Sequence, residues 1–137
     1  VVSTWSKDPS TKVGAVIVKN MRLISQGWNG FPRGVVDDER LDDREVKYSL
    51  TVHAEMNAIF NAGYNGVSLR DSTLYVYGLP VCSDCAKGVM QTGITRVVSS
   101  FTKLSDKWIE SGKKSAAMFA EAGIEYERFE GKFPWDM

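Results

Sequence analysis

The single histidine and both cysteines of this 137-residue chain fall in two short segments, and each segment begins a predicted helix. The first segment reads T-V-H-A-E-M-N-A at 51–58, and the second reads P-V-C-S-D-C-A-K at 80–87. Imidazole and thiolate are ligands that zinc prefers, and three protein ligands leave a fourth position open for water, which is typical of catalytic zinc. We therefore expect His53, Cys82 and Cys85 to hold one zinc ion.

The start of a helix suits both clusters, because unsatisfied amides and the positive end of the helix dipole lower the pKa of a thiol. Cys82 and Cys85, at i and i+3, lie on one face of a helix. His53 and Glu55 are two positions apart and diverge on a regular helix, so a shared role requires the metal near the helix start. We expect Glu55 to be the catalytic residue, which exchanges protons with the attacking water, the substrate ring and the departing amine.

Each of these residues also has an ordinary interpretation. A lone histidine near a helix start is most often a cap or a half-buried residue with its hydrogen bonds satisfied, and a lone C-x-x-C is compatible with redox chemistry or with no function. Taken together, the residues match the H-x-E and P-C-x-x-C signature of zinc deaminases. One departure is the extra Val81 between Pro80 and Cys82, which leaves the ligand spacing intact but leaves open which backbone carbonyl meets the substrate's amino group.

The remaining pattern alternates strands with helices. We expect strands at Val13–Val18, Arg22–Trp28, Thr73–Tyr77, Ile94–Ser99 and Ile124–Arg128, the first two forming a hairpin through a turn at Lys19 and Asn20. We expect helices at Thr51–Ala62, with an apolar stripe of Val52, Met56, Ile59 and Phe60 and with Gly63 at C′, at Cys82–Gln91, and at Lys113–Ala122, which Gly123 ends. The polar stretch Gly30–Arg44 predicts a long functional loop.

This order of elements predicts an α/β fold, a three-layer α/β/α sandwich with a mixed, mostly five-stranded sheet. The length suits a single domain over 1–137. Val1–Trp5 reads like the last turn of a helix whose start is missing, so we expect the N-terminus to be incomplete.

Composition narrows the partners and the compartment. Seventeen basic and seventeen acidic residues cancel, which argues against capture of a nucleic acid polymer and favours a small-molecule substrate. No apolar run is long enough to span a membrane. A disulfide between cysteines three residues apart would constrain little, so we expect a metal site in a reducing compartment and a cytoplasmic location.

With these residues in hand, the chain resembles the deoxycytidylate (dCMP) deaminase family of the cytidine deaminase superfamily, over nearly its whole length. Besides the two clusters, the likeness includes S-K-D-P-S-T-K-V-G-A-V-I-V at 6–18, G-W-N-G-F-P at 27–32, K-Y at 47–48, C-A-K followed by Q-T-G-I within 85–94, and A-G-I-E-Y at 122–126. The resemblance implies a cytidine deaminase-like fold and hydrolysis of dCMP to dUMP and ammonia with zinc-activated water, which supplies dUMP for dTMP synthesis.

The resemblance also implies substrate contacts. Asn29 would hydrogen-bond the nucleotide, the amide of Ala54 would hold the 2-oxo group, and Val16 would line the base pocket. The amino group would meet a carbonyl near Pro80 and Val81. Asn29-Gly30 is equally compatible with a tight turn. Phe101 and Trp108 are candidates for an apolar wall of the pocket, although each is more often a core or interface residue.

Allosteric control by dCTP and dTTP with Mg²⁺, and a homo-oligomer, expected to be a hexamer, are further implications of the resemblance. The effector site would include Gly27, Trp28, Asn29, Gly30, Phe31, Lys7 and Asp38. The acidic side chains that could help hold the Mg²⁺, or form a solvated charged run, are Asp37, Asp38, Glu39, Asp42 and Asp43. Candidates for phosphate contacts are Lys7, Lys12, Arg33, Arg40 and Arg44.

Two alternatives to a mononucleotide deaminase stay open. One is a deaminase that acts on a polymer base, such as adenosine in tRNA or cytosine in single-stranded DNA. The other is a non-catalytic structural zinc module in which Glu55 or Asp84 closes the fourth coordination position. Asp84 is also a natural acidic residue for the first turn of a helix.

Overall fold

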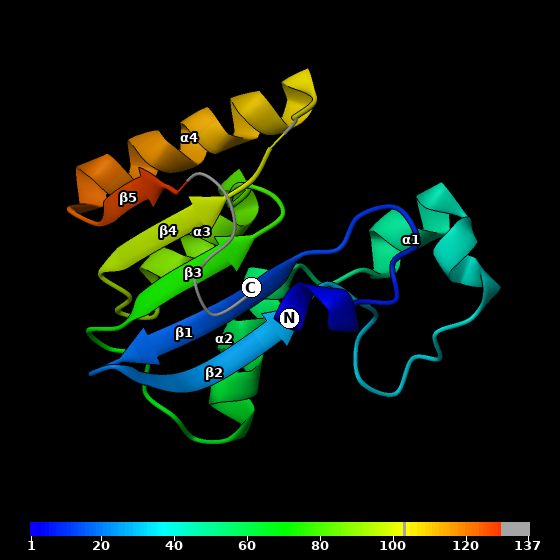
Figure 1. The fold of residues 1–137 in the computed structure, drawn as a ribbon, viewed down its shortest axis with the longest axis horizontal. Helices are drawn as coiled ribbons and strands as arrows, with labels where there is room; N and C mark the ends of the chain where they lie inside the picture. Colours follow the sequence, from blue (N-terminus) through cyan, green and yellow to red (C-terminus); the bar gives the residue numbers. More distant parts are fainter. Residues whose placement is uncertain (103, 130–137) are drawn as a thin grey trace.

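A five-stranded mixed sheet forms the centre of the protein in a computed structural model that describes residues 1–102 and 104–129. The strands lie in the order β2-β1-β3-β4-β5 (Figure 1). β1 is antiparallel to β2 and β3, whereas β3, β4 and β5 are parallel. The strand bounds are Gly14–Lys19 for β1, Arg22–Trp28 for β2, Thr73–Tyr77 for β3, Arg96–Ser100 for β4 and Glu125–Arg128 for β5.

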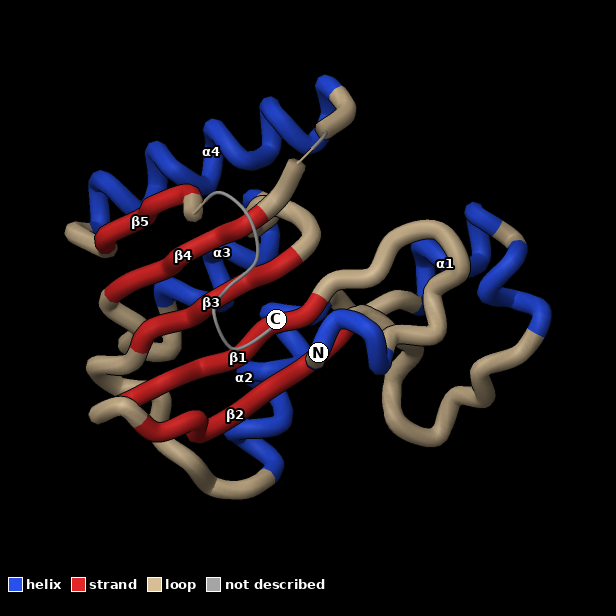
Figure 2. The backbone as a smooth tube through the Cα atoms, viewed as in Figure 1, coloured by secondary structure: helices blue, strands red, loops and turns tan. Residues whose placement is uncertain are grey.

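The described helices are two short 3₁₀ helices and four α-helices. Their bounds are Val2–Trp5 for η1, Glu39–Asp42 for η2, Arg44–Leu50 for α1, Ala54–Tyr64 for α2, Ser83–Met90 for α3 and Asp106–Ala122 for α4. α2 and α3 lie behind the sheet in the view of Figure 2, and α3 contacts both α2 and α4. The predicted mixed α/β fold is therefore confirmed. In the described residues, no helix is both long and apolar enough to cross a membrane.

The pairing of β1 with β2 shows which face of the sheet each helix covers. Ala15 pairs with Gly27, and a Cβ atom at Gly27 would lie 2.4 Å from the backbone nitrogen of Ala58 in α2. Gly14 precedes Ala15 in β1 and therefore faces the opposite side of the sheet. A Cβ atom at Gly14 would lie 2.5 Å from the backbone nitrogen of Ser3 in η1. α2 and η1 therefore cover opposite faces of the sheet.

The hydrophobic core lies between the sheet and the α2, α3 and α4 layer. Neighbouring strands place Ile17, Leu74, Val97 and Tyr126 in register, so these side chains share one face. The ring of Phe119 in α4 packs edge-on against Tyr126, with ring centroids 5.1 Å apart. Phe119 is fully buried, so α4 lies on the same face as α2.

The sequence placed α2 incorrectly at both ends. The helix begins at Ala54 rather than Thr51, and Gly63 lies inside it, whereas Gly66 takes the left-handed backbone with φ 69°. Of the predicted apolar stripe, Met56 and Ile59 pack against the core, whereas Phe60 is 52% exposed and the helix fully buries Ala54, Ala58 and Ala62. The close approach of α2 to Gly27 leaves room for a methyl group but not for a larger side chain.

Three other predicted boundaries change. The hairpin turn consists of Asn20 and Met21, both with positive φ, and not of Lys19, which extends β1. The predicted loop Gly30–Arg44 contains η2 and leads into α1, which the sequence analysis did not anticipate. α4 begins at Asp106, well before Lys113, because the half-buried Trp108 continues its apolar face onto the core. Gly123 ends α4 with φ 76°, as predicted.

Candidate active site

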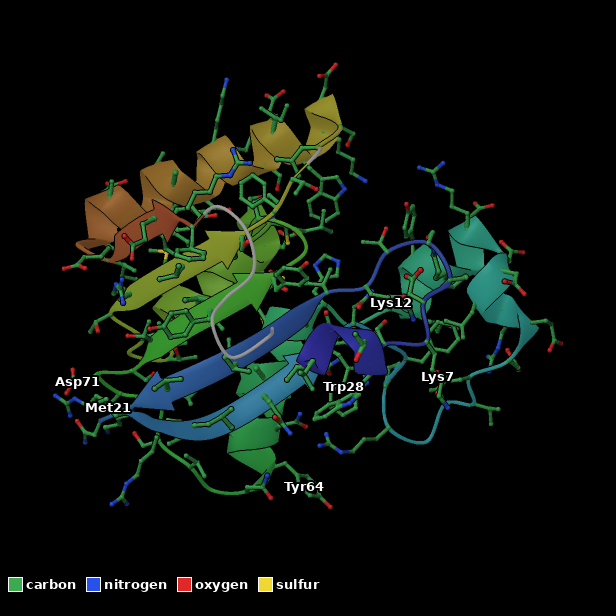
Figure 3. The ribbon with its side chains drawn as sticks, in the orientation of Figure 1. Lys7, Lys12, Met21, Trp28, Tyr64 and Asp71 are labelled. Carbon is green, nitrogen blue, oxygen red and sulfur yellow. The ribbon has the colours of Figure 1, made fainter. Side chains whose placement is uncertain are left out.

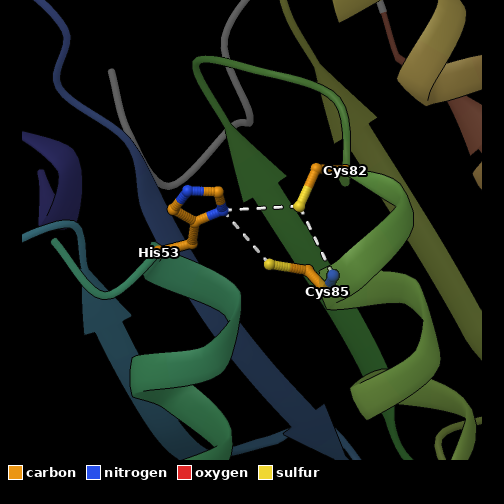
Figure 4. A group of neighbouring side chains, drawn as sticks. All are labelled: His53, Cys82 and Cys85. Atoms are coloured by element: carbon orange, nitrogen blue, oxygen red, sulfur yellow. Dashed lines mark hydrogen bonds between the residues drawn. The ribbon is translucent and has the colours of Figure 1, made fainter. Parts of the chain in front are cut away.

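Two helix starts bring the predicted metal ligands together. His53 is the N-cap residue of α2, and Cys82 is the N-cap residue of α3, each with an extended backbone, while Cys85 lies in the first turn of α3. Figure 4 shows the imidazole of His53 facing both cysteine side chains across the gap between the two helices. The N-cap conformation turns His53 out of the regular helix, which resolves its divergence from Glu55.

The three side chains converge on one point. The Nδ1 atom of His53 lies 3.2 Å from Sγ of Cys85 and 3.4 Å from Sγ of Cys82. All three donor atoms lie within 4.8 Å of one another, and among residues 1–102 and 104–129 no other group of metal-ligating side chains converges in this way. One imidazole nitrogen and two sulfurs form a donor set that fits zinc and leaves a fourth position open.

The cysteines share one proton unequally. The pKa of Cys82 falls to about 4, because its sulfur accepts a hydrogen bond from the side chain of Cys85, and burial opposes this shift only in part. The pKa of Cys85 rises, because its thiol makes that hydrogen bond and because it is buried. The hydrogen bond with Cys82 also raises the pKa of His53. Cys82 is therefore ready to bind a metal as the thiolate, and metal binding displaces the proton of Cys85.

Glu55 is a buried carboxyl in the first turn of α2, only 4% exposed. Burial raises its pKa to about 7, which is the range in which a group can both accept and release a proton at neutral pH. Its carboxylate is not in the cluster formed by His53 and the cysteines. It lines the cavity beside them, where it can act on a bound molecule.

That cavity runs from the ligand cluster to a polar end. The residues that line it are Asp8, Ser10, Thr11, Val13, Asn29, Lys47, Tyr48, Thr51, His53, Ala54, Glu55, Leu79, Pro80 and Trp108. The carboxyl ends of β3 and β4 point to this end of the molecule, and α1 lies beyond them (Figure 1). The cavity therefore offers ligands and a proton carrier at one end, and charged and amide groups at the other.

Four of the predicted substrate and wall residues line the cavity, and three do not. Asn29, Ala54, Pro80 and Trp108 lie in its wall. Val16 is a correction: it alternates with Ala15 and Ile17 and so lies on the sheet face that η1 covers, and Val13 takes its place in the wall. Val81 is fully buried and does not line the cavity, and its carbonyl accepts a hydrogen bond from Ser115 Oγ at 2.7 Å, so its contact with the substrate stays a prediction.

The two aromatic candidates for the pocket wall, Trp108 and Phe101, lie in different places. The ring of Trp108 lies 6.2 Å from that of His53, centroid to centroid, at the edge of the cavity. Phe101 lines a different groove, beside α4 and β5, and packs against the guanidinium of Arg128. Only Trp108 is therefore placed to contact a ring bound near the ligand cluster.

A buried network at the polar end of the cavity was missed by sequence analysis. The Nζ atom of Lys47 lies 3.2 Å from Oδ1 of Asp8 and 2.8 Å from Oγ of Ser10, and both charged residues are 6% exposed. Burial alone would raise the pKa of Asp8, but the amides of Ser10 and Thr11 and the ammonium of Lys47 hold it below its ordinary value. The K-Y pair at 47–48 was the available signal, but no role was assigned to it.

Asn29 is also part of this network. Its Oδ1 atom accepts from the amide of Val13 at 2.8 Å, and its Nδ2 atom donates to the carbonyl of Thr11 at 2.9 Å and to Oδ2 of Asp8 at 3.5 Å. The tight-turn interpretation of Asn29-Gly30 is wrong, since neither residue has a positive φ and Gly30 pairs with Val52 instead.

The residues predicted for an effector site each make separate contacts within the protein. Gly27 packs against α2, Trp28 packs edge-on against Trp5 at 5.3 Å, and Gly30 bonds to Val52. Phe31 lies 5.8 Å from the guanidinium carbon of Arg40. Lys7 forms an exposed ion pair with Asp37 at 3.7 Å, and Asp38 pairs with Arg40 at 2.9 Å. The side chains of the acidic run do not converge as a metal-binding group in the described residues.

Most of the predicted phosphate contacts have other partners. Lys12 donates to the carbonyl of Ser6, and Arg33 donates to Asn61 while stacking on Tyr64. Lys7 and Lys12 lie at the end of the sheet opposite Met21 (Figure 3). Arg44 differs from these, since its guanidinium carbon lies 5.3 Å from the ring centroid of Tyr48 in the cavity wall.

Comparisons with known proteins agree with this geometry. Residues 1–101 match the family described as the cytidine and deoxycytidylate deaminase zinc-binding region. An uncharacterized deaminase from the luxG 3′ region of Aliivibrio fischeri is 43% identical over 127 residues, which cover 91% of this chain and 84% of that protein. The deoxycytidylate deaminase of Homo sapiens is 36% identical over 133 residues, which cover 90% of this chain and 71% of that protein.

A solved structure shares the fold. The dCMP deaminase of cyanophage S-TIM5, in complex with dCMP and dUMP, superposes with a TM-score of 0.74 at 25% identity. The superposition covers 93% of this chain and 88% of the phage chain. The likeness therefore includes nearly every element described above.

Proposed function

This chain belongs to the cytidine and deoxycytidylate deaminase family, and we propose on that basis that it hydrolyses dCMP to dUMP and ammonia. The observation that carries the proposal is the convergence of His53, Cys82 and Cys85 on one side of a cavity that also contains the buried carboxyl of Glu55. The choice of dCMP as substrate is supported by relatives named deoxycytidylate deaminase and by a structural neighbour in complex with dCMP and dUMP.

His53, Cys82 and Cys85 would hold the zinc ion through Nδ1 and the two sulfurs. Bound zinc lowers the pKa of a water molecule and so supplies the nucleophile at neutral pH. The start of α3 favours the thiolate of Cys82, because the amide of Cys85 donates to its Sγ at 3.3 Å.

Glu55 would move the protons. Its carboxylate would take a proton from the attacking water and deliver it to the ring nitrogen of cytosine. It would then take the second proton from the hydroxyl group added at C4 and give it to the amine, which leaves as ammonia while C4 becomes a carbonyl. Burial keeps Glu55 away from bulk solvent and raises its pKa to about 7, in the range suited to both accepting and releasing a proton. The carboxyl ends each cycle in the protonation state in which it began.

The cavity wall supports specific contacts with the nucleotide. The amide of Ala54 would hold the 2-oxo group, and the carbonyl of Pro80 or of Val81 would accept from the amino group. Both amide hydrogens of Asn29 are already donated within the protein. Asn29 would therefore meet the sugar through its oxygen, as an acceptor from a hydroxyl group.

The two alternative functions receive less support. Asp84 is exposed and pairs with Lys87 at 3.0 Å, and neither Asp84 nor Glu55 belongs to the ligand cluster, so no described carboxylate closes a structural zinc site. The net charge of zero gives no general attraction for a polymer. A single mononucleotide makes few phosphate contacts and suits this chain better.

We also propose that the whole chain is one domain, that it is cytoplasmic and that it forms a homo-oligomer, with a hexamer implied by the family. Two free thiols at the metal site support a reducing compartment. Control by dCTP and dTTP with Mg²⁺ stays a prediction from family resemblance. Adding either nucleotide to a dCMP assay tests it, and sedimentation of the purified protein tests the assembly.

The substrate proposal is tested by offering dCMP, CMP, deoxycytidine, dCTP and a cytosine-containing oligonucleotide separately to the zinc-loaded protein. We expect kcat/KM to be highest for dCMP, with ammonia released in equal amount to dUMP. Added salt should change this rate little, whereas polymer binding falls steeply with salt. A rate confined to the oligonucleotide would favour the polymer deaminase instead.

A further inference from the structure

The segment 80–83, which carries Cys82, lies against one face of α4. Cys82 is the N-cap residue of α3 and has an extended backbone, so the hydrogen bonds of a regular helix do not fix its orientation (Figure 4). Gly112 of α4 faces this segment, and a Cβ atom added there would lie 3.5 Å from Cβ of Pro80. α4 therefore packs directly on the stretch of backbone that presents one of the metal ligands.

Two serines of α4 hold the backbone on both sides of Cys82. The carbonyl of Val81 accepts a hydrogen bond from Oγ of Ser115 at 2.7 Å. The amide of Ser83 donates to Oγ of Ser111 at 2.9 Å. These two groups belong to the peptide bonds before and after Cys82, and each peptide bond is planar. The two hydrogen bonds therefore fix the direction in which the side chain of Cys82 leaves the backbone.

The two serines are placed to act together. They are four positions apart, so both hydroxyl groups lie on the same face of α4. Ser115 is fully buried in the middle of the helix, and its hydroxyl also lies 3.1 Å from the carbonyl of Ser111. Serine is a poorer helix former than alanine, and a buried hydroxyl costs free energy unless it is hydrogen-bonded. Packing of α4 alone would favour alanine at both positions, so the hydroxyl groups point to another role.

The same face of α4 reaches the cavity. Trp108 lies one turn before Ser111 and Gly112, and its ring lines the cavity 6.2 Å from the ring of His53, centroid to centroid. α4 thus contacts the surroundings of two metal ligands that come from different helices. A change at Ser111 or Ser115 should be felt at the metal centre, although neither side chain is part of the ligand cluster.

We infer that Ser111 and Ser115 are positioning residues for the metal centre, which act by holding the backbone of Cys82. The inference rests on the proposed function, because it takes Cys82 to bind the zinc ion together with His53 and Cys85. Hydrogen bonds that orient a metal ligand restrict the geometries that it can offer, and their removal typically costs about 10–100-fold in metal affinity. Both contacts reach Cys82 from a helix that supplies none of the three ligands.

The test measures metal binding by the full chain, with Co²⁺ in place of zinc. The absorption bands of Co²⁺ report on the geometry and thiolate ligation of the bound ion. The wild type, Ser111→Ala and Ser115→Ala are titrated in competition with a chelator of known affinity, after circular dichroism has shown that each is folded. We expect each variant to bind Co²⁺ about tenfold more weakly or worse, and its absorption bands to shift, because Cys82 is no longer held in one orientation.

The matched control is Ser72→Ala. Ser72 is also buried and donates from Oγ to a backbone carbonyl, that of Leu69, but it precedes β3, whereas Cys82 follows that strand. Ser72→Ala should lose stability and keep the affinity and absorption bands of the wild type. A second control is Ser111→Thr, which keeps the hydroxyl group at a half-buried position and should bind Co²⁺ as the wild type does.

Three outcomes would overturn the inference. Wild-type affinity and absorption bands in Ser111→Ala or in Ser115→Ala would exclude that serine as a positioning residue. An equal loss of affinity in Ser72→Ala would attribute the effect to stability. A loss in Ser111→Thr as large as that in Ser111→Ala would show that the hydroxyl group is not responsible. A wild type that binds no Co²⁺ would instead overturn the proposed metal site, and the inference with it.

Discussion

The Nδ1 atom of His53 lies 3.2 Å from Sγ of Cys85, although the two residues are 32 positions apart in the chain. His53 lies at the start of α2, which precedes β3, and Cys85 lies at the start of α3, which follows β3. The packing of both helices on the sheet therefore fixes the distance between the two residues. The ligands of this site are testable one at a time.

Replacing Cys85 with serine should remove the metal. Serine has no ionised group at neutral pH to replace the thiolate, so we expect zinc affinity to fall by well over tenfold. Zinc per chain is measured by atomic emission after dialysis against a chelator. The control is Asp84→Asn, which changes the adjacent exposed carboxylate that pairs with Lys87. Loss of zinc in Asp84→Asn would show instead that a carboxylate closes the site.

The buried pair of Asp8 and Lys47 should contribute strongly to stability. Asp8→Asn leaves the ammonium of Lys47 buried without its partner, and we expect the free energy of unfolding to fall by about 3–5 kcal/mol. Asp37→Asn removes the exposed partner of Lys7 and should cost about 1 kcal/mol or less. Urea denaturation of both variants measures the difference. Similar small losses in the two variants would contradict the buried pair.

The same pair predicts a pH dependence. The pKa of Asp8 in the folded protein lies below its ordinary value of 3.8, so its contribution is complete above that value. As pH falls below the ordinary value towards the folded pKa, the unfolded chain gains a proton first and the contribution is lost. Unfolding midpoints of the wild type and Asp8→Asn should therefore converge as the pH is lowered towards 3. Parallel curves over that range would contradict the assignment.

Two glycines of the β2 and α2 layer should respond in opposite ways to alanine. A Cβ atom at Gly27 would meet backbone atoms of α2 at 2.4 and 2.6 Å, so Gly27→Ala should displace the helix and cost about 1–3 kcal/mol. Gly63 lies inside α2 with open space around it, so Gly63→Ala should stabilise the protein by about 0.5–1 kcal/mol. Thermal unfolding measures both. If Gly63→Ala were less stable than the wild type, α2 would end at Ala62 with Gly63 at C′, as predicted from the sequence.

The sequence predicted the parts of the molecule that local pattern determines. Strand alternation located the hairpin and Thr73–Tyr77, and the spacing of His53, Cys82 and Cys85 indicated that one ion could use all three. Packing determined the rest. The alanine face of α2 follows from its contact with Gly27, and the side of the sheet that Val16 occupies follows from strand register.

The buried ion pair could not be predicted from the sequence either, because it also depends on packing. Lys47 and Asp8 are ordinary surface residue types, and only the folded chain shows that both are buried and in contact. Lys107 could not be connected with Tyr48, because α4 was expected to start later and no periodicity links α4 to α1. Sequence analysis found the metal ligands because their chemistry is rare, and missed the polar end of the cavity because its chemistry is common.

The most direct test of the account is the zinc content and the dCMP deamination rate of Glu55→Gln, measured on one preparation beside the wild type. Glutamine keeps the shape of the side chain but cannot carry a proton between water and the ring. We predict that the variant holds as much zinc as the wild type and forms dUMP about 10³-fold more slowly. Near-normal dUMP formation by a zinc-loaded Glu55→Gln would contradict the central claim that this carboxyl moves the protons.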